Sequence, residues 1–397
     1  MTDINSLLIL EVYSVMFYKK FLKPILFHFD PEAVHDFFTS TGEFLGKNSI
    51  MCSLVGAIYN YRGSDISKIV DGIKYRTPIL LSAGFDYNGR LSRILGSIGL
   101  GGEEIGSVTA RACEGNPKPR LTRLPKSKSI LVNKGLSNDG VDAIIKRLKK
   151  TPRQKDFVMG IYIARTNDAQ SVANQAAIDD YVYSFKRLNE ENVGDYYTIN
   201  ISCPNAFDGE SFANPELLER LLLALKKIPC SKPIYVKMPI NIPWEQFNSL
   251  LKIIDINGMN GVVIGNLNKD YDSLEVRSEA PAVFKGGLSG KPCRQLSTEL
   301  IRKTRESYGK RFTIIGVGGI MSPETAKEKF DAGADLLQLI TGMIFEGPGL
   351  IKRIAKSLKI PHLASQGTPF FKGGFGASCV NSPFEKGGVL NEKHSDE

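Results

Sequence analysis

The sequence has few residues of the kinds that build metal clusters. It holds four histidines and six cysteines in 397 residues, and no two cysteines stand in a CxxC spacing. Protein zinc sites usually draw on closely spaced pairs of these residues. We therefore expect no bound metal, and the scattered thiols fit a reducing compartment.

Long hydrophobic runs and long basic runs are also missing. The longest apolar stretch, Leu7–Tyr18, is interrupted by Glu11, and it is shorter than the ~20 residues of a membrane-spanning helix. The formal net charge is +9, yet the densest basic cluster, Lys146–Lys150, suits a solvated helix end. We expect no nucleic-acid partner, and the positive charge fits anionic lipid or a small anionic ligand. No signal-peptide pattern opens the chain, which favours a cytoplasmic location.

The first 60 residues are unusually apolar and form a region of their own. "FLKPILFHF" (21–29) is followed by "DPEAVHDFF" (30–38), in which Asp30 suits a helix N-cap and Pro31 its first position. Short apolar helices of this kind favour a region that lies on the cytoplasmic surface of a membrane as a peripheral anchor. Packing on the main domain or on a second subunit is the alternative.

Residues 61–362 alternate between short apolar runs and longer amphipathic helices, such as 214–228 and 322–333. Almost continuous hydrophobic strands are typical of a parallel sheet that is covered on both faces. Eight such units predict a (β/α)8 TIM barrel, with a six-stranded doubly wound sheet as the competing fold. The eight runs are 78–84, 103–109, 157–163, 196–202, 233–238, 261–266, 312–319 and 335–341.

The last segment, residues 363–397, has a different composition. It is rich in Gly, Ser and Pro and contains the near-repeat "PFFKGG" and "PFEKGG". Such a segment cannot bury enough apolar surface to fold by itself, so we expect a disordered tail.

The active site of a barrel lies at the carboxyl ends of its strands. Here those ends are rich in Gly and Asn, with one lysine, Lys237. Glycines after the seventh and eighth runs suit a phosphate group, which indicates FMN or a pyridoxal-type cofactor. Lys237 suits a side chain that reaches solvent, a Schiff-base lysine, or a fixed charge beside a flavin. The residues alone leave these three open.

Several motifs, in order and spacing, resemble those of dihydroorotate dehydrogenases over Phe21–Ile360. The opening "FHFDPEAVHDFF" and the block "GNPKPRLTRLP" are similar to the quinone-linked, membrane-associated branch of that family. The other motifs are "AGFDYNG", "EIGSVTARACEGNPKPRLTRLP", "NKGLSNDG", "NISCPN", "VKMP", "GGLSGKP", "IIGVGGI" and "LLQLITGMIFEGPGLIKRI".

This resemblance implies an FMN enzyme that oxidises (S)-dihydroorotate to orotate in pyrimidine synthesis and passes electrons to quinone. It implies that Cys203 is the catalytic base and that Arg123 contacts the quinone. The implied substrate contacts are Asn133, Asn200, Asn205 and Asn266. The implied FMN contacts are Ala83, Gly84, Ser107, Asn200, Lys237, Gly290, Gly319 and Thr341.

Four positions depart from the family pattern. Cys203 stands where the quinone-linked branch usually has serine, and Tyr87 where the family has a lysine that contacts flavin and substrate. Tyr162 replaces an asparagine and Leu267 a threonine. Either Tyr87 and a nearby base such as Lys134 compensate for the lost charge, or the substrate differs.

Two alternatives follow from these departures. One is an enzyme like the soluble branch, which oxidises dihydroorotate or another dihydropyrimidine with fumarate or NAD. The other is a flavin-binding membrane protein without turnover. The sequence does not predict the oligomeric state.

Overall fold

The computed structural model describes residues 16–202, 211–281 and 286–358. The chain divides into two units, residues 1–359 and 360–397, and all described residues belong to the first. Two predicted site residues, Cys203 and Asn205, lie outside the described residues, as does the predicted disordered tail, 363–397.

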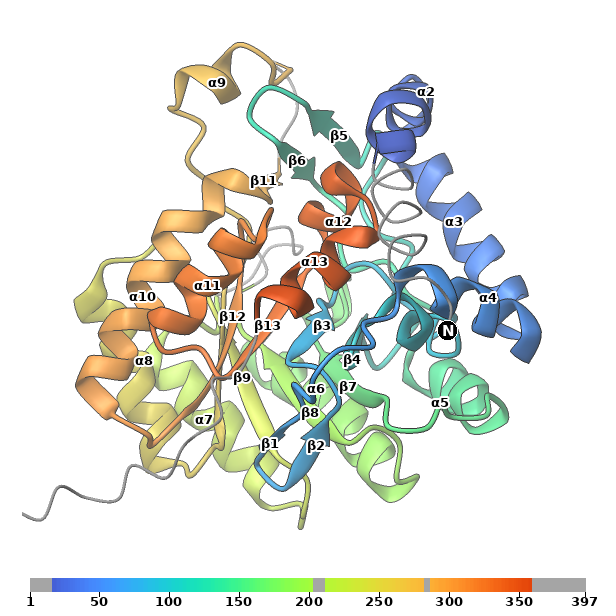
Figure 1. Cartoon of the computed structure of the whole chain (residues 1–397). Coiled ribbons are helices and arrows are strands. Elements are labelled where there is room, and N and C mark those ends of the chain that lie inside the picture. The colour runs from blue at the N-terminus through green and yellow to red at the C-terminus, as the bar shows by residue number, and fades with distance from the viewer. Residues whose placement is uncertain (1–15, 203–210, 282–285, 359–397) are drawn as a thin grey trace, which may run out of the picture. The chain divides into compact units, whose positions relative to one another are not determined.

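Eight parallel strands form a closed barrel at the centre of the first unit (Figure 1). Each coincides with one of the predicted apolar runs, so the TIM barrel is confirmed and the doubly wound alternative is wrong. The strands are β3 (Ile79–Leu81), β4 (Gly102–Val108), β7 (Val158–Ile163), β8 (Tyr196–Asn200), β9 (Ile234–Met238), β10 (Gly261–Ile264), β12 (Thr313–Val317) and β13 (Leu336–Leu339).

Amphipathic helices surround these strands (Figure 1). Their starts follow local capping chemistry: Asn214 accepts hydrogen bonds from two backbone N–H groups of α7, and Ser322 forms a capping box with Thr325 in α11. The helices are α5 (Val141–Lys150), α6 (Asn174–Glu190), α7 (Pro215–Lys226), α8 (Trp244–Ile256), α10 (Arg294–Tyr308), α11 (Pro323–Asp331), α12 (Thr341–Glu346) and α13 (Gly349–Ser357).

The barrel separates two hydrophobic cores. A large core fills the space between the strands and the helices, and a smaller one lies inside the barrel. The hairpin of β1 (Lys68–Val70) and β2 (Ile73–Tyr75) adds Val70 and Tyr75 to the inner core, and Figure 1 shows it across one end of the barrel. Nearly all strand residues are buried, as parallel strands covered on both faces require.

Several short elements decorate the barrel, and the apolar pattern did not predict them. β5 (Leu121–Leu124), β6 (Ser129–Val132) and β11 (Gly287–Leu288) form a small antiparallel sheet. Strands of two to four residues carry too little periodicity to be recognised. The remaining short elements are η2 (Leu95–Ile98), η3 (Ala169–Ser171), α9 (Leu274–Arg277) and η4 (Lys291–Cys293).

The apolar N-terminal region is helical, as expected. It comprises η1 (Tyr18–Leu22), α2 (Lys23–Phe27), α3 (Pro31–Gly46) and α4 (Ser49–Tyr59). Asp30 is the N-cap of α3, since its carboxylate accepts a hydrogen bond from the backbone N–H of Ala33 at 2.8 Å. None of the described helices combines the length and apolarity needed to cross a membrane.

Much apolar surface stays exposed on these helices. Phe44 is 72% exposed and Phe37 62%, whereas Glu32, Thr39 and Gly46 on α3 are buried. α3 thus buries some polar and small residues while it leaves Phe37 and Phe44 exposed, which is unusual for a surface helix. The exposed large apolar side chains of this region are Met16, Phe17, Phe21, Ile25, Phe29, Phe37, Phe38, Phe44, Ile50, Met51, Leu54 and Ile58.

Candidate active site

A cavity of about 560 Å³ lies at the carboxyl ends of the barrel strands, and residues near the end of, or directly after, each of the eight strands line it. It continues to α2, α3 and α4, which contribute apolar side chains. The volume is in the range of small-molecule and cofactor sites. The cavity brings together many of the predicted site residues: Ala83, Gly84, Ser107, Arg123, Asn200, Lys237, Asn266, Gly290, Gly319 and Thr341.

Lys237 on β9 is one of the residues that line this cavity. It pairs in register with Asn200 on the neighbouring strand, and it is only 5% exposed, so it does not reach solvent. Its ammonium lies 5.0 Å from the centre of the Tyr162 ring. Burial raises the pKa of Glu104, which also lies inside the barrel, while the nearby Lys237 charge opposes that rise. Lys237 is therefore a buried side chain that lines the cavity from the barrel side.

Glycines with left-handed backbone form the turns on one side of the cavity. Gly290 has φ +81°, and a Cβ there would come within 2.8 Å of Thr341 Cγ2. Gly319 has φ +71°, and its Cβ would come within 2.4 Å of Arg294 Cβ. The hydroxyls of Ser289 and Thr341 lie 2.8 Å apart between these turns. Such turns leave backbone N–H groups and hydroxyls open to a ligand, which fits a phosphate.

The predicted asparagines differ in their placement. The Oδ1 atom of Asn200 accepts a hydrogen bond from the backbone N–H of Ser202 at 3.1 Å, and Asn266 Nδ2 donates to Ser202 Oγ at 2.7 Å. These two amides are held together at the cavity wall by Ser202. Asn133 instead accepts a hydrogen bond from Asn116 Nδ2 at 2.8 Å. Among the described residues, Asn133 is not one of those that line the cavity.

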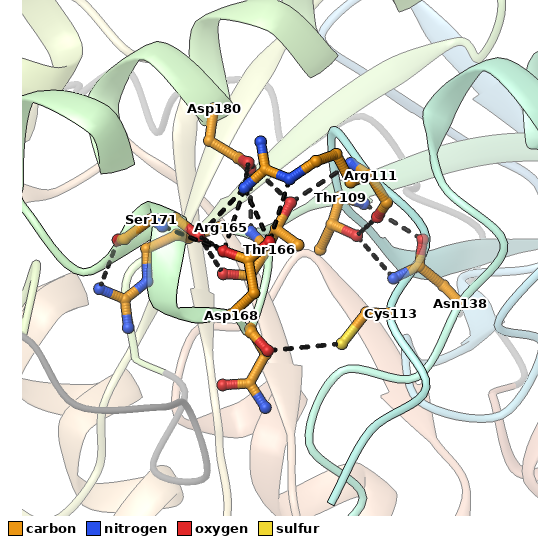
Figure 2. Close-up of polar contacts among 10 residues, drawn as sticks. Thr109, Arg111, Cys113, Asn138, Arg165, Thr166, Asp168, Ser171 and Asp180 are labelled. Atoms are coloured by element: carbon orange, nitrogen blue, oxygen red, sulfur yellow. Dashed lines mark hydrogen bonds and ion pairs between the residues drawn. The ribbon is translucent and has the colours of Figure 1, made fainter.

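A network of charged and hydroxyl side chains fixes the loops behind this wall (Figure 2). The Arg111 guanidinium donates to both carboxylate oxygens of Asp168, at 3.0 and 3.1 Å, and lies 3.3 Å from the Asp180 carboxylate. Asp180 also accepts from the hydroxyl of Thr166 at 2.6 Å. The network joins the loops after β4 and β7 to α6. It thereby positions the loop that carries Asn116.

Comparison with known proteins assigns a family. The family model described as dihydroorotate dehydrogenase matches residues 66–360. This chain belongs to that family.

The similarity to individual known proteins extends over most of the chain. A protein from Christiangramia forsetii named dihydroorotate dehydrogenase (quinone) is 36% identical over 353 residues, covering 86% of this chain and 98% of the relative. One of the same name from Thermosynechococcus vestitus is 34% identical, covering 89% and 98%. The structure of ligand-free DHODH from Eimeria tenella has a TM-score of 0.72 and 25% identity, covering 83% of this chain and 94% of that one. The dihydroorotate dehydrogenase family is flavin-dependent, and its members are oxidoreductases.

Three of the four positions that depart from the dihydroorotate dehydrogenase pattern line the cavity. Tyr87, Tyr162 and Leu267 all contribute to its wall. Burial raises the pKa of Tyr87, with further increases from the Glu32 and Asp36 charges. The Tyr87 phenol therefore stays neutral at physiological pH. A tyrosine in place of a lysine leaves position 87 without a positive charge.

The other end of the cavity is apolar and lies among the N-terminal helices. Leu26, Phe27, Val34 and Phe38 line it. Arg123 enters this region from β5. Its Nη1 atom donates to the carbonyl of Phe29 at 2.8 Å, and its guanidinium lies 4.8 Å from the centre of the Phe27 ring. Partial burial lowers the pKa of Arg123, which nevertheless remains charged.

Sequence reasoning missed two polar residues of α3 that lie at or beside the site. Glu32 forms an ion pair with Arg120 (2.6 Å) and contacts Lys134, and His35 Nε2 lies 2.7 Å from the carbonyl oxygen of Phe85. In the sequence, Glu32 looks like an ordinary first-turn residue that suits the helix dipole. No local pattern marks partners that lie about ninety residues away.

Proposed function

We propose that this chain oxidises (S)-dihydroorotate to orotate in pyrimidine synthesis and transfers the electrons to a quinone. One observation carries the proposal. A single cavity joins a polar end, with Asn200, Lys237 and Asn266, to an apolar end among the N-terminal helices. One cavity can thereby bind a polar substrate at one end and a hydrophobic acceptor at the other. Membership of the family supports the same reaction.

The cofactor that fits this cavity is FMN. The glycine turns at Gly290 and Gly319, with the Thr341 hydroxyl, would hold its phosphate. Lys237, fixed in the barrel, would place a positive charge beside the ring system. The remaining residues proposed to hold FMN are Ala83, Gly84, Ser107 and Asn200. FMN, when bound, supplies the two-electron carrier between substrate and acceptor.

Amide side chains suit the substrate, which is a small cyclic diamide with a carboxylate. An asparagine amide both donates and accepts hydrogen bonds, so it pairs with such a ring edge. We assign this role to Asn200 and Asn266, and from the sequence to Asn133 and Asn205. To contact the substrate, Asn133 would have to exchange its hydrogen-bond partner, since its Oδ1 accepts from Asn116 Nδ2.

Cys203 is proposed as the catalytic base that removes a proton from C5 of dihydroorotate. It follows Ser202 directly in the chain, and Ser202 bonds both Asn200 and Asn266. A thiol with an ordinary pKa of about 8.5 serves as a base at neutral pH when its thiolate is locally stabilised.

Quinone is proposed to enter between the N-terminal helices. Arg123 would donate a hydrogen bond to a quinone oxygen, because its guanidinium carries five N–H groups and faces the apolar end. The exposed apolar side chains of α3 and α4 would rest on the cytoplasmic surface of a membrane. The protein is then peripheral, with its acceptor drawn from the lipid.

Two half-reactions test this proposal separately. Anaerobic L-dihydroorotate is added to the purified flavoprotein, and the visible flavin absorbance is followed. Loss of absorbance is expected, and a flavin that stays oxidised would refute the assigned substrate. A short-chain quinone is then added to the reduced protein, in parallel with fumarate and NAD. Reoxidation by fumarate or NAD, without reoxidation by quinone, would refute the assigned acceptor.

A further inference from the structure

A buried ion-pair cluster lies between α3 and the cavity. Its carboxylate is Glu32, which is 4% exposed. The Arg120 guanidinium donates to both oxygens of Glu32, at 2.6 and 3.1 Å, and the Lys134 ammonium bonds to the same carboxylate. Burial alone would raise the pKa of Glu32, but hydrogen bonds from Lys134 and Arg120 outweigh it and lower the pKa. The carboxylate is therefore ionised.

The charges in this cluster do not cancel. One carboxylate faces two cations, so the cluster of Glu32, Arg120 and Lys134 carries one excess positive charge. The three side chains are no more than about an eighth exposed (6–12%). Charges that are shielded from water act more strongly on a neighbouring ion than surface charges do. The cluster therefore attracts an anionic group that enters the cavity.

Lys134 is the member of the cluster that lines the cavity. Its ammonium lies 4.9 Å from the centre of the Tyr87 ring. An ammonium has three N–H donors, and the Glu32 carboxylate is its hydrogen-bond partner within the part of the chain that the structure describes. Donors remain for a ligand on the cavity side.

Two other Lys or Arg side chains line the cavity within the described residues, and both have different surroundings. Lys237 lies inside the barrel near Glu104, whose pKa is raised by burial while the Lys237 charge opposes the rise. Arg123 lies at the apolar end against the Phe27 ring. Of these three cations, Lys134 is the one that belongs to the buried Glu32–Arg120–Lys134 cluster.

We propose that Lys134, in the positively charged cluster that it forms with Arg120 and with Glu32 of α3, binds the carboxylate of the substrate. The helix α3 then contributes to both ends of the cavity: Glu32 belongs to the substrate-binding cluster, and apolar side chains of the helix line the proposed quinone entrance. This inference rests on the proposed function, because it takes an anionic dihydropyrimidine as the ligand. It also explains how a chain with Tyr87 retains a cation for that carboxylate.

The test uses the full-length protein with its flavin and measures the Kd of orotate by titration calorimetry. Lys134→Met removes the charge but keeps a similar shape, and we expect the Kd to rise about 10- to 100-fold. Lys134→Arg keeps a cation, so binding should stay within about threefold of the unmodified protein. Thermal unfolding of each variant reports on its folding.

A variant of Glu32, the ion-pair partner of Lys134, distinguishes a binding role of Lys134 from a purely structural one. Glu32→Gln increases the positive excess beside the cavity, so orotate should bind as tightly as before or more tightly. If the Glu32–Lys134 ion pair only holds α3 on the barrel, Lys134→Met and Glu32→Gln break the same interaction. Both variants would then weaken orotate binding. Glu43→Gln is the matched control. Glu43 lies on α3 like Glu32, and its carboxylate pairs with Arg90 at 2.6 Å. It does not line the cavity within the described residues.

Three results would overturn the inference. The first is a Lys134→Met Kd within about twofold of the original, and the second is equal weakening by Lys134→Met and Glu32→Gln. If Glu32→Gln fails to fold, the pair Lys134→Met and Lys134→Arg still decides. The third concerns the unmodified protein. If it neither binds orotate nor loses flavin absorbance with dihydroorotate, the proposed function fails, and this inference fails with it.

Discussion

Gly319 and Gly309 both have positive φ, but they differ in their surroundings. A Cβ on Gly319 would meet Arg294 at 2.4 Å, whereas Gly309, with φ +54°, has nothing within 4 Å of that position. Gly319→Ala adds a clash beside the cavity to the strain that both substitutions share. The backbone strain alone costs about 1–3 kcal/mol.

We therefore predict that Gly309→Ala lowers stability by about 1–3 kcal/mol and keeps the flavin. Gly319→Ala should lose more stability and be purified with little flavin. Thermal unfolding and the absorbance ratio of flavin to protein measure both effects. Equal stability and equal flavin content in the two variants would contradict the assignment of this turn to the cofactor.

The proposed base is testable by substitution at Cys203. Cys203→Ala removes the proton acceptor, so flavin reduction by dihydroorotate should fall by at least about a hundredfold while flavin remains bound. Cys203→Ser should retain low activity, since a hydroxyl is a weaker base at neutral pH. Stopped-flow absorbance under anaerobic conditions gives the rates. Unchanged rates in Cys203→Ala would exclude Cys203 as the base.

At the scale of single elements, α3 has two functional faces. Its buried side contributes Glu32 to the site, while Phe37 and Phe44 point outward and are 62% and 72% exposed. Burial of a phenylalanine side chain contributes about 1.5–3 kcal/mol. Such exposed aromatic rings on a helix that lines the cavity fit a membrane contact.

The double variant Phe37→Glu, Phe44→Glu should weaken binding to anionic vesicles by about tenfold or more. Reduction of the flavin by dihydroorotate should be unaffected, because neither side chain lines the cavity within the described residues. Ile256→Glu on α8 is the control, as Ile256 is 73% exposed but lies on a helix of the barrel. Vesicle sedimentation measures the binding. Equal loss with Ile256→Glu would point to a general charge effect.

At the scale of the whole molecule, two buried carboxyl groups set a pH dependence of stability. Burial raises the pKa of Glu103 on β4 well above its ordinary value of 4.5, and the nearby Asp86 adds to the rise. Burial also raises the pKa of Asp86, although backbone N–H groups such as those of Arg90 and Leu91 oppose it. Above pH 4.5, the folded protein therefore holds more protons on these two groups than the unfolded chain does. Its stability falls as the pH rises from there toward the folded-state pKa.

Glu103→Gln removes this titration. The variant should gain stability relative to the original as the pH is raised, with a gain at about pH 8 that exceeds the gain at about pH 5 by roughly 1 kcal/mol or more. Unfolding temperatures at both pH values test the prediction. Glu219→Gln, at an exposed position of α7, is the control. A gain for Glu103→Gln that is independent of pH would refute the proposed titration.

The sequence alone predicted the barrel because its signals are local. Each strand is a short apolar run, and helix starts such as Asn214 and Ser322 are marked by residues within one turn. Since parallel strands all point their carboxyl ends to one side, the residues after those runs had to meet. That rule predicts that Asn200, Lys237, Gly319 and Thr341 share one cavity, as they do.

The tertiary structure decided the contacts between distant segments. The pairing of Glu32 with Arg120 and Lys134 joins residues that are 88 and 102 positions apart, and no periodicity encodes such a pair. The pairing of Asn133 with Asn116 has the same cause, because the two residues belong to different segments of the chain. Local chemistry fixes which elements form, whereas the packing of loops and of α3 on the barrel determines which charges face the substrate.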